Sequence, residues 1–525
     1  MTNWPLFCRS EMDKVFSLGA LLEGGQLPFD REAAVCFGHF NTIHPGHVRY
    51  FRNARGYGPC VVVALEGDEQ VPFQERSSMF SQEERAQSLA MLDLVDFIVI
   101  LDRGGLDQFL ALLDRPTLIL GKEFEETRAT KVHPAVKQVK GSGGRVIYDP
   151  GETQYSSLEL FSGSSSELEE RRWRAFRAAL KANNFSMADV ISQMDSGPRP
   201  RILVIGDTIM DRYIACDALG MSNEAPVVVV RELEARDYLG GAAIVAAHLA
   251  TLGAASTFLS VTGQDSMQSI VDAKLKEFDV TPFLLVDEDR PTTLKIRYMV
   301  DSQKLFRVSR LKEHSLAREI EEELIVQVRS EAANSDAILV SDFVYGVITP
   351  RVLEAARIAA RDNGIPIFGD LQCSSQVGSI LKFKQFSLIC PTEREARIAL
   401  GNHDDGLEFL ANLLIEKTKS RNTILKLGGE GFIAYEESGG EGRFFKRQHF
   451  PALSVNPVDV TGAGDALLAA MAMGLTKGLT LMQSCALATC VSAIAVQTLG
   501  NEPITSGQVK QFLMKSKNSG LLDGI

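Results

Sequence analysis

Two histidines near the amino terminus, His44 and His47, stand three residues apart where a helix is expected to begin. They follow the apolar run AAVCF, and Pro45 and Gly46 lie between them. Side chains three apart share a helix face, and the first turn offers an anion free N–H groups and the positive end of a dipole. The imidazoles are therefore placed to hydrogen-bond a triphosphate as charge builds during displacement. The alternatives are histidines that cap or pack the helix and, less favoured, a metal-binding pair.

A second candidate site lies in the segment DVTGAGDALLAAMAMG, residues 459–474. Its small residues Gly462, Ala463 and Gly464 open a long apolar helix, and consecutive N–H groups there make an anion-binding nest. Asp465 lies in the first turn, where it can accept the proton of an alcohol that attacks a γ-phosphate. The alternative is a carboxylate that only stabilises the helix start through the dipole.

Both candidate sites need elements that place them at the edge of a sheet. From Ala33, short β-rich runs such as CVVVAL, DFIVIL and PTLIL alternate with helical segments. This alternation predicts βαβ units and a parallel sheet. It restarts after residue 200 with RILVIGD, where the early strands follow one another closely and the later ones alternate with helices. We expect two unrelated α/β domains, the second a large doubly wound domain that bears a small β flap.

Two changes of composition mark the boundaries between these domains. A Gly/Ser-rich patch, FSGSSS, follows the first domain, and DSGPRPR precedes the second. We expect an N-terminal extension over residues 1–30, a first domain over 31–162, a linker and helix over 163–199, and a second domain over 200–525.

The overall composition narrows the classes of partner and compartment. The 525 residues are 45% hydrophobic and carry a net charge of −12, which argues against nucleic acid or an anionic membrane as the main partner. The eight cysteines contain no C-x-x-C pair, so we expect free thiols. Residues 479–499 carry no charge, but their hydrophobicity is modest and a buried helix is expected rather than a membrane span. No signal peptide is evident, and a cytoplasmic protein is expected.

The segment FGHFNTIHPGHVRYFRNAR resembles the G-x-F-D-x-x-H-x-G-H block of the nucleotidyltransferase superfamily, which includes glycerol-phosphate cytidylyltransferases and heptose-phosphate adenylyltransferases. The resemblance covers residues 33–161 and includes SQEERAQSLAMLDLVDFIVI, LILGKEF and YSSLEL. It implies a Rossmann-like domain in which His44 and His47 assist catalysis. The residues that it implies for nucleotide binding are Gly38, Phe40, Asn41, Arg85, Gly121, Ser156 and Ser157.

The implied reaction needs no general base, because a sugar 1-phosphate is already an anion and attacks the α-phosphorus of a nucleoside triphosphate directly. The protein and Mg²⁺ stabilise the charge, and pyrophosphate leaves. The resemblance favours ATP as the nucleotidyl donor, with CTP as the alternative. Asn41 and Glu123 stand where the family usually has Asp, and residues 68–76 lack a lysine that it commonly places on the triphosphate.

From Arg201 to the end, the chain resembles the ribokinase-like (PfkB) sugar kinases, and most closely the heptose 7-phosphate kinases. The resemblance rests on GDTIMDRYIACDALGMSNEAPVVVV, LGGAAIVAAHLATLGA, PTTLKIRYMVDSQKLFRVSR, CPTEREA, KLGGEGF and the DVTGAGD turn. The residues that it implies for sugar binding are Asp207, Asp211, Gly240 and Gly241; for the substrate's phosphate, Lys295, Arg297, Gln303 and Arg307; for ATP, Gly428, Gly431 and the nest; and for Mg²⁺, held through water, Glu395. The departures from the family's pattern are Ile244, Tyr345, Thr392 and Thr489.

A kinase of this kind joined to a nucleotidyltransferase resembles the bifunctional enzymes of ADP-heptose synthesis, although those usually carry the kinase first. The resemblance implies that heptose 7-phosphate is phosphorylated at O1 and that, after a separate phosphatase has acted, the sugar 1-phosphate is coupled to a nucleotide. Two alternatives stay open: a sugar kinase whose N-terminal domain only binds nucleotide, and a non-catalytic nucleotide-sensing scaffold. The expected partners are sugar phosphates and nucleoside triphosphates, with a homodimer formed through the flap as a further expectation.

Overall fold

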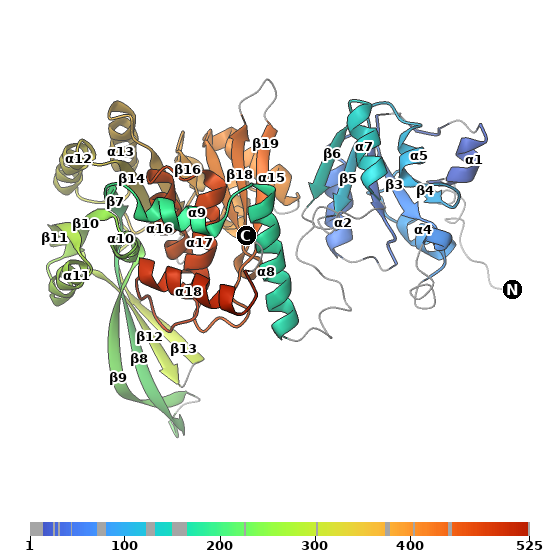
Figure 1. Cartoon of the computed structure of the whole chain (residues 1–525). Coiled ribbons are helices and arrows are strands. Elements are labelled where there is room, and N and C mark those ends of the chain that lie inside the picture. Colours follow the sequence, from blue (N-terminus) through green and yellow to red (C-terminus); the bar gives the residue numbers. More distant parts are fainter. Residues whose placement is uncertain are drawn as a thin grey trace. The chain divides into compact units, whose positions relative to one another are not determined.

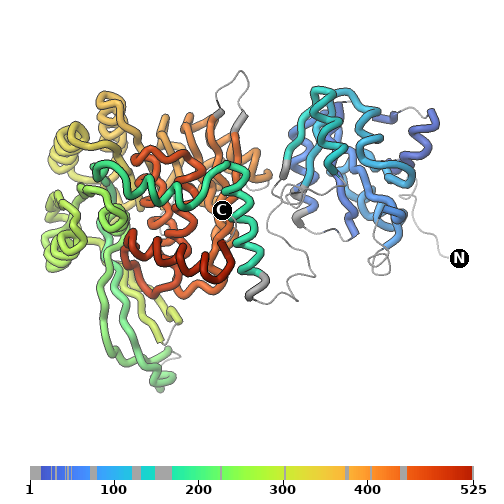
Figure 2. The backbone as a smooth tube through the Cα atoms, in the orientation of Figure 1, coloured from blue at the N-terminus to red at the C-terminus, as the bar shows by residue number. Residues whose placement is uncertain are grey.

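The computed structural model of the chain describes residues 14–24, 27–29, 32–41, 43, 45–70, 80–121, 132–149, 165–224, 227–300, 303–372, 378–402, 405–438 and 444–522. The chain divides into two compact units, one of Met1–Ser162 with Asn402–Asn412 and one of Gly163–Gly401 with Leu413–Ile525. Both units are of the α/β type (Figure 1). The tube in Figure 2 follows the backbone from blue in the first unit to red at the carboxyl end of the second.

The first unit is built on a parallel sheet with the strand order β1-β4-β3-β2-β5-β6. The strands are β1 (Val15–Ser17), β2 (Ala34–Gly38), β3 (Val61–Glu66), β4 (Phe97–Leu101), β5 (Thr117–Gly121) and β6 (Arg145–Asp149). The helices are α1 (Leu18–Leu22), α2 (Pro45–Ala54), η2 (Asp68–Gln70), α4 (Gln82–Ala90), α5 (Leu106–Leu110) and α7 (His133–Gly141). Val35 and Cys36 of β2 pack into two different hydrophobic clusters, so both faces of the sheet are covered.

The strand order of this sheet reverses between β2 and β5. From β2 the chain continues to β3 and β4 on one side, and then to β5 and β6 on the other. Ligands of open α/β sheets bind beyond the carboxyl ends of the strands at such a switch point. Gly38 and Gly121 end the two strands, so two of the predicted nucleotide-binding residues lie at this point.

The second unit begins with two helices from the predicted linker, α8 (Ser165–Ala182) and α9 (Met187–Asp195). Trp173 and Phe176 of α8 are buried in the same hydrophobic cluster as residues of the helices that cover the main sheet. These two helices therefore belong to the core of the second unit.

The main sheet of the second unit has the order β11-β10-β7-β14-β15-β16-β17-β18-β19. Its strands pair in parallel from β11 to β17, and β18 pairs antiparallel with both β17 and β19. The strands are β7 (Arg201–Gly206), β10 (Ala255–Gly263), β11 (Val280–Asp287), β14 (Ala337–Asp342), β15 (Ile367–Leu371), β16 (Leu388–Ile389), β17 (Asn422–Lys426), β18 (Phe432–Ser438) and β19 (Phe444–Phe450). Ile202 and Val204 face one hydrophobic cluster, and Leu203 between them is equally buried. Both faces of the sheet are thus covered, as expected for a doubly wound fold.

The helices that follow in this part of the chain are α10 (Gly241–Thr251), α11 (Ser266–Glu277), α12 (Arg318–Ala332), α13 (Pro350–Asp362), η3 (Ile380–Lys382), α14 (Glu393–Leu400), α15 (Leu407–Thr418), η4 (Gly428–Glu430), α16 (Ala463–Thr476), α17 (Leu481–Ala495) and α18 (Ser506–Asn518). Helix α15 begins within the residues that belong to the first unit. The uncharged segment 479–499 contains α17, which is buried as predicted. No helix in the described ranges has the length and apolar character needed to span a bilayer. Each cysteine that the structure describes is a free thiol.

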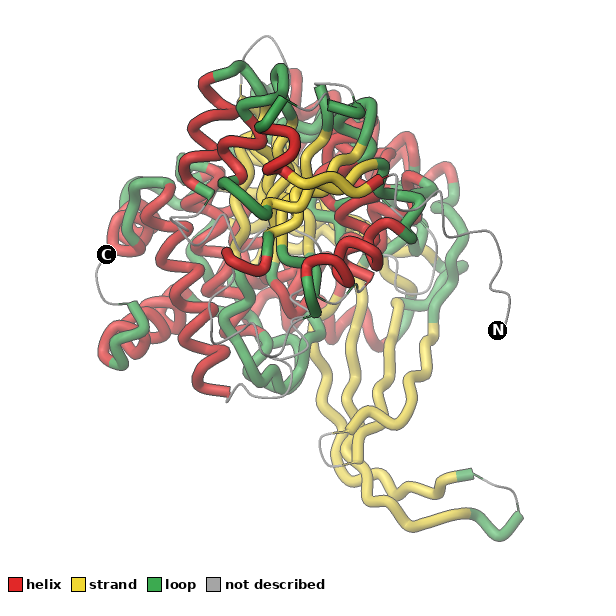
Figure 3. Tube along the Cα trace, turned by 90° about the vertical axis from the view of Figure 1, so that its right-hand side faces the viewer, coloured by secondary structure: helices red, strands yellow, loops and turns green. Residues whose placement is uncertain are grey.

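A four-stranded sheet forms the predicted flap, with the order β13-β12-β8-β9. Its strands are β8 (Thr208–Met221), β9 (Val228–Gly240), β12 (Thr293–Val300) and β13 (Gln303–Arg310). Figure 3 shows these strands running out from the body of the second unit. Large apolar side chains remain exposed on the flap, among them Leu219, Met221, Val228, Leu233 and Phe306. The predicted fold class, two α/β domains of which the second bears a small β flap, is confirmed.

Candidate active sites

The end of β2 forms a tight turn in the first unit. Phe40 has a left-handed φ of 45° although it is not glycine, and its ring is buried. A β-carbon at Gly38 would lie 3.1 Å from that ring, so the turn favours glycine there. Asn41 Oδ1 accepts a hydrogen bond of 2.8 Å from the Phe80 amide, which ties the turn to the segment before α4. Strained backbone held in place in this way is typical of binding sites.

His47 lies in the first turn of α2, beyond the carboxyl end of β2. Its half-buried ring meets the Phe40 ring edge-on, with the two centroids 5.1 Å apart. This contact orients the imidazole at the switch point of the sheet. The predicted residues His44, Ser156 and Ser157 lie outside the described residues, as do Glu123 and positions 71–76 of the segment that lacks the family's lysine.

Arg85 is buried on α4 and donates four hydrogen bonds within the protein. Three go to the main-chain oxygens of His39, Glu66 and Phe80, and the fourth goes to Asp68 Oδ1 at 2.6 Å. A guanidinium has five N–H donors, so most of them hold the loops at the ends of β2 and β3. The sequence resemblance implies a direct contact of Arg85 with triphosphate, which stays a prediction; in the structure its guanidinium binds the loops at the ends of β2 and β3.

A cavity of about 650 Å³ lies in the second unit, beyond the carboxyl ends of its parallel strands. It brings together most of the residues predicted for the second site. Those that line it are Asp211, Gly241, Lys295, Arg297, Arg307, Glu395, Gly428, Gly431, Gly462, Ala463, Gly464 and Asp465. Gly240 lies directly beside the cavity, because a β-carbon there would be 2.4 Å from Asp211 Oδ2.

The predicted anion nest starts α16 at one end of this cavity. Gly462 is the N-cap and has a left-handed φ of 80°, and a β-carbon there would lie 2.1 Å from Asn501 Oδ1. Only glycine fits such a position without strain. Asp465 follows in the first turn and is buried, and the side-chain amide of Gln372 donates to its Oδ1 at 2.6 Å. The nest and the carboxylate therefore face one space, with one carboxylate oxygen held by Gln372.

The environment of Asp465 favours the protonated form of this carboxyl group. Burial raises its pKa to about 8, and the negative charges of Asp370 and Asp211 act in the same direction, while Lys426 and the hydrogen bond from Gln372 oppose them. A carboxylate with a pKa close to the working pH is well suited to take a proton during a reaction.

Asp211 also lines the cavity. It forms an ion pair with Arg297, and the side-chain amide of Asn501 donates to its Oδ2 at 3.2 Å. Arg297 also lies over the Tyr213 ring, 5.1 Å from the centroid. The guanidinium is thus fixed before any ligand arrives.

Lys295 on β12 brings a buried positive charge to the cavity beside Asp211, which it faces across the paired strands. Its ammonium lies 5.3 Å from the centre of the Phe343 ring and 5.1 Å from that of Tyr345. Tyr345, which stands where the family commonly has lysine, therefore supports a lysine from another strand through a cation–π contact. Lys295 and Arg307 together give the cavity the charge that a phosphate would require.

Asp207 lies beneath the cavity instead of on its wall. Its carboxylate accepts hydrogen bonds from the Phe343 amide at 2.7 Å and the Val347 amide at 3.2 Å, and thereby holds the loop that follows β14. Burial and the neighbouring Asp342 raise its pKa to about 7. The resemblance implies direct sugar binding by Asp207, and the structure gives it the role of loop anchor. Gln303, at the exposed start of β13, is likewise not among the lining residues.

Glu395 lies in the first turn of α14 and lines the cavity. Its Oε2 accepts from the Thr392 amide at 2.8 Å and the Thr392 hydroxyl accepts from the Glu395 amide, which forms a capping box. No cluster of three or more His, Cys, Asp or Glu residues suited to a metal occurs among the described residues. The Glu395 carboxylate lines the cavity together with the turn at Gly428 and Gly431. It fits Mg²⁺, which usually keeps several waters and binds nucleotide phosphates.

Three side chains around Asp465 were not predicted from the sequence. Lys426 pairs with Asp370 at 2.6 Å, and Gln372 holds Asp465. The sequence does hold a signal for Lys426, because this lysine interrupts the apolar run of a strand just before the turn at Gly428. Asp370 and Gln372 end an ordinary buried strand and carried no such signal.

A second unpredicted group connects the flap with the nest. Asp459 accepts hydrogen bonds from the Lys304 ammonium at 2.7 Å, the Tyr213 hydroxyl at 2.9 Å and the Thr461 amide at 3.0 Å. Although burial raises the pKa of Asp459, these donors outweigh it and lower the pKa to about 2. Lys304 lies on β13 and Tyr213 on β8, so one carboxylate joins two flap strands to the loop that carries the nest.

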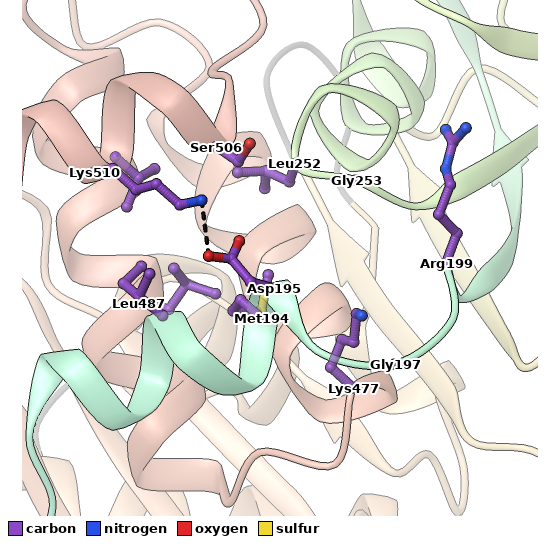
Figure 4. Close-up of a pocket in the computed structure, with 12 residues that line it drawn as sticks. Met194, Asp195, Gly197, Arg199, Leu252, Gly253, Lys477, Leu487, Ser506 and Lys510 are labelled. Carbon is purple, nitrogen blue, oxygen red and sulfur yellow. Dashed lines mark ion pairs between the residues drawn. The ribbon is translucent and has the colours of Figure 1, made fainter.

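A smaller cavity of about 220 Å³ lies between α9, the loop after α10 and the helices α16 to α18 (Figure 4). Lys510 pairs across it with Asp195 at 2.8 Å, and Lys477 donates to the Ser196 carbonyl. Its lysines are therefore engaged within the protein, and none of the predicted site residues lines it.

Comparisons with known proteins match both units of the chain. The profile of pfkB family carbohydrate kinases matches residues 199–505, and a cytidylyltransferase-like profile matches residues 35–211. The bifunctional protein HldE of Pelobacter propionicus is 31% identical over 311 residues, 58% of this chain and 62% of that protein. HldE of Campylobacter jejuni serotype O:6 is 32% identical over 330 residues, 62% of this chain and 66% of that protein. The matches thus span less than two thirds of these relatives' lengths.

Solved structures resemble the second unit in fold. Escherichia coli phosphofructokinase-2 in complex with potassium has a TM-score of 0.51 and 16% identity, covering 61% of this chain and 100% of that chain. The same enzyme in complex with substrates and products has a TM-score of 0.50 and 15% identity, covering 60% and 99%. At this level of identity, the likeness concerns the fold alone.

We expect Arg85→Met to destabilise the first unit, because it would leave three main-chain oxygens without their donor, at about 1–3 kcal/mol for each unsatisfied group. Differential scanning calorimetry and hydrogen exchange of the full chain should show earlier unfolding of the first unit only. The control is Arg103→Met, because Arg103 is exposed. Unchanged unfolding of Arg85→Met would contradict this role.

We expect Asp459→Asn to lower the stability of the second unit in a pH-dependent way. Because the folded-state pKa is depressed to about 2 from 3.8, the charged form stabilises the fold above pH 4, by about 2 kcal/mol, and this contribution is lost as the pH falls toward 2. Thermal unfolding midpoints of wild type and variant should differ at pH 7 and converge at low pH. Asp362→Asn, at an exposed ion pair, is the control; a difference that does not change with pH would refute the assignment.

Proposed function

Because the chain belongs to the pfkB family of carbohydrate kinases, we propose that its second unit transfers the γ-phosphate of ATP to a hydroxyl group of a sugar phosphate. The observation that carries this proposal is Asp465 in the first turn of α16, beside the nest and on the wall of the large cavity. The hydroxyl oxygen attacks the γ-phosphorus, the bond to the β,γ-bridging oxygen breaks, ADP leaves, and Asp465 takes the hydroxyl proton. Mg²⁺, held through water by Glu395, would neutralise charge on the nucleotide.

The positive charges that line the cavity support a substrate that already carries a phosphate. Lys295 and Arg307 come from flap strands, and Arg297 is fixed against Asp211 close by. We propose heptose 7-phosphate as the substrate and O1 as the position phosphorylated. This choice follows the sequence resemblance to heptose 7-phosphate kinases and the similarity to proteins named HldE.

We propose that the first unit transfers a nucleotidyl group to a sugar 1-phosphate. A phosphate oxygen of the sugar attacks the α-phosphorus, pyrophosphate leaves, and the product with ATP as donor is ADP-heptose; CTP is the alternative donor. The supporting observations are the switch point between β2 and β5, the strained turn at Phe40 and the orientation of His47. The cytidylyltransferase-like match and the word bifunctional in the relatives' names also support nucleotidyl transfer by the first unit.

One observation favours a second candidate, a sugar kinase whose first unit binds nucleotide without catalysis. Asn41 and Arg85 of the predicted nucleotide site are both committed to contacts inside the protein. A nucleotide-sensing scaffold without either activity is the remaining alternative. The assays below distinguish the three.

We also propose that the protein works as a homodimer in the cytoplasm. The exposed apolar side chains of the flap, such as Leu219, Leu233 and Phe306, would be covered by a second copy. The free thiols are those expected of a reducing compartment.

The decisive experiment assays the purified chain for ADP release with heptose 7-phosphate and for pyrophosphate release with heptose 1-phosphate. We expect Asp465→Asn to lower the first activity by about 10²–10⁴-fold and to spare the second. We expect His47→Ala to lower only the second. Parallel loss of both activities in either variant would contradict two independent sites. Tight nucleotide binding with neither activity would leave only the scaffold.

The pH profile gives a separate test of Asp465. Because its pKa is raised to about 8 and the ionised form is the base, kcat/KM for ADP release should rise with pH and level off above pH 8. Gln372→Met removes a hydrogen bond that favours the ionised form, so its profile should shift to higher pH. A profile that is flat from about pH 6 to about pH 9, a range that includes the expected pKa of about 8, would contradict this assignment.

A further inference from the structure

Lys426 is the last residue of β17 and points into the large cavity. It precedes the turn at Gly428, and its side chain is only 11% exposed. A charge at the end of a buried strand is unfavourable unless it is paired. Asp370, itself 1% exposed, binds the Lys426 ammonium at 2.6 Å. The lysine is therefore both buried and held in one place.

The ammonium of Lys426 lies against the nest. A β-carbon built on Gly464 would be 3.4 Å from Lys426 Nζ and 3.9 Å from Gln372 Nε2. Gly464 is the residue before Asp465, so the lysine and the glutamine flank the point where the nest meets the proposed base. Although burial lowers the pKa of Lys426, the carboxylates of Asp370 and Glu395 outweigh it and the net shift is upward. The group is thus a permanent cation.

We propose that Lys426 is a further catalytic residue of the second unit, whose ammonium contacts the γ-phosphoryl group of ATP while this group is transferred to the sugar. The inference rests on the proposed kinase function. It is carried by the position of the ammonium beside Gly464, on the wall of the cavity and next to Asp465. Main-chain N–H groups supply only partial charges to an anion in the nest, and Lys426 adds a full charge at the same point.

The chemistry of the transfer explains why a fixed cation is useful there. As the bond to the bridging oxygen breaks and the bond to the sugar oxygen forms, negative charge spreads over the three outer oxygens of the phosphoryl group. A donor that is already in place stabilises this charge without reorganising. Asp370 provides that preorganisation, because it holds the ammonium at the end of β17 before the nucleotide binds.

The competing explanation is that Lys426 only neutralises the buried carboxylates around it. Removing one partner of such a pair is destabilising because the other charge is left alone. Lys426→Met combined with Asp370→Asn removes both charges and corrects that imbalance. If Lys426 is purely structural, the double variant should behave like wild type. If Lys426 is catalytic, the double variant should still lack the positive charge that stabilises the phosphoryl group. Lys382, which pairs with the buried Asp342 but does not line the cavity, offers a matched control.

The test measures how the full-length protein binds ADP with Mg²⁺, with and without aluminium fluoride, which imitates the phosphoryl group in transfer. Isothermal titration calorimetry should show similar ADP affinity for wild type, Lys426→Met and the double variant. Fluoroaluminate should tighten ADP binding to wild type, and we expect this gain to fall by about 10²-fold in both variants. Lys426→Arg should keep part of the gain, and Lys382→Met all of it.

A double variant that regains the full fluoroaluminate effect would overturn the proposal and leave Lys426 with a structural role. The proposal would also be overturned if ADP affinity and the fluoroaluminate gain fell together in every Lys426 variant. Because this readout needs no sugar, it is separate from the assay with heptose 7-phosphate. If the wild-type protein does not phosphorylate heptose 7-phosphate but the Lys426 variants lose the fluoroaluminate gain, the result supports the role of Lys426 and rejects the proposed substrate.

Discussion

Three carboxylates, Asp370, Glu395 and Asp465, lie around one end of the large cavity, and holding them there is the constraint on which the second unit depends. Burial and neighbouring carboxylates raise the pKa of Asp370 and Asp465. Lys426 offsets the repulsion, Gln372 hydrogen-bonds Asp465, and the start of α16 contributes its dipole. These groups come from two strand ends and two helix starts, which the carboxyl edge of a parallel sheet brings together.

The flap strands that line the cavity are coupled to the nest through shared side chains. Asp459 binds Tyr213 and Lys304 from the flap while it also shapes the loop that leads to the nest. Asn501 contacts Asp211 with its amide nitrogen, and its oxygen fills the space where a side chain on Gly462 would be. The flap is therefore structurally linked to the nest. A change in flap position is expected to reach the nest through these two side chains.

The sequence predicts the features that depend on residues close to one another along the chain. Alternating apolar and helical segments indicate the parallel sheets, and a glycine-rich turn before an apolar helix indicates the nest and Asp465. The contacts that sequence reasoning missed join distant positions. Asp207 anchors an amide 136 residues away, and Asn501 reaches across 290 residues to Asp211. Arg85 looks like a ligand for phosphate in its motif, but it is held by loops that only the folded chain brings to it.

The two proposed reactions require different groups at the same kind of sheet edge. A sugar hydroxyl must lose a proton to attack phosphorus, so the second unit needs a buried carboxylate whose pKa is raised. A sugar 1-phosphate is already anionic, and a carboxylate facing it would repel it. In the first unit Asp68 is bound by Arg85, while the first turn of α2 carries the imidazole of His47. The difference between a general base in one unit and hydrogen-bond donors in the other thus follows from the charge of each proposed nucleophile.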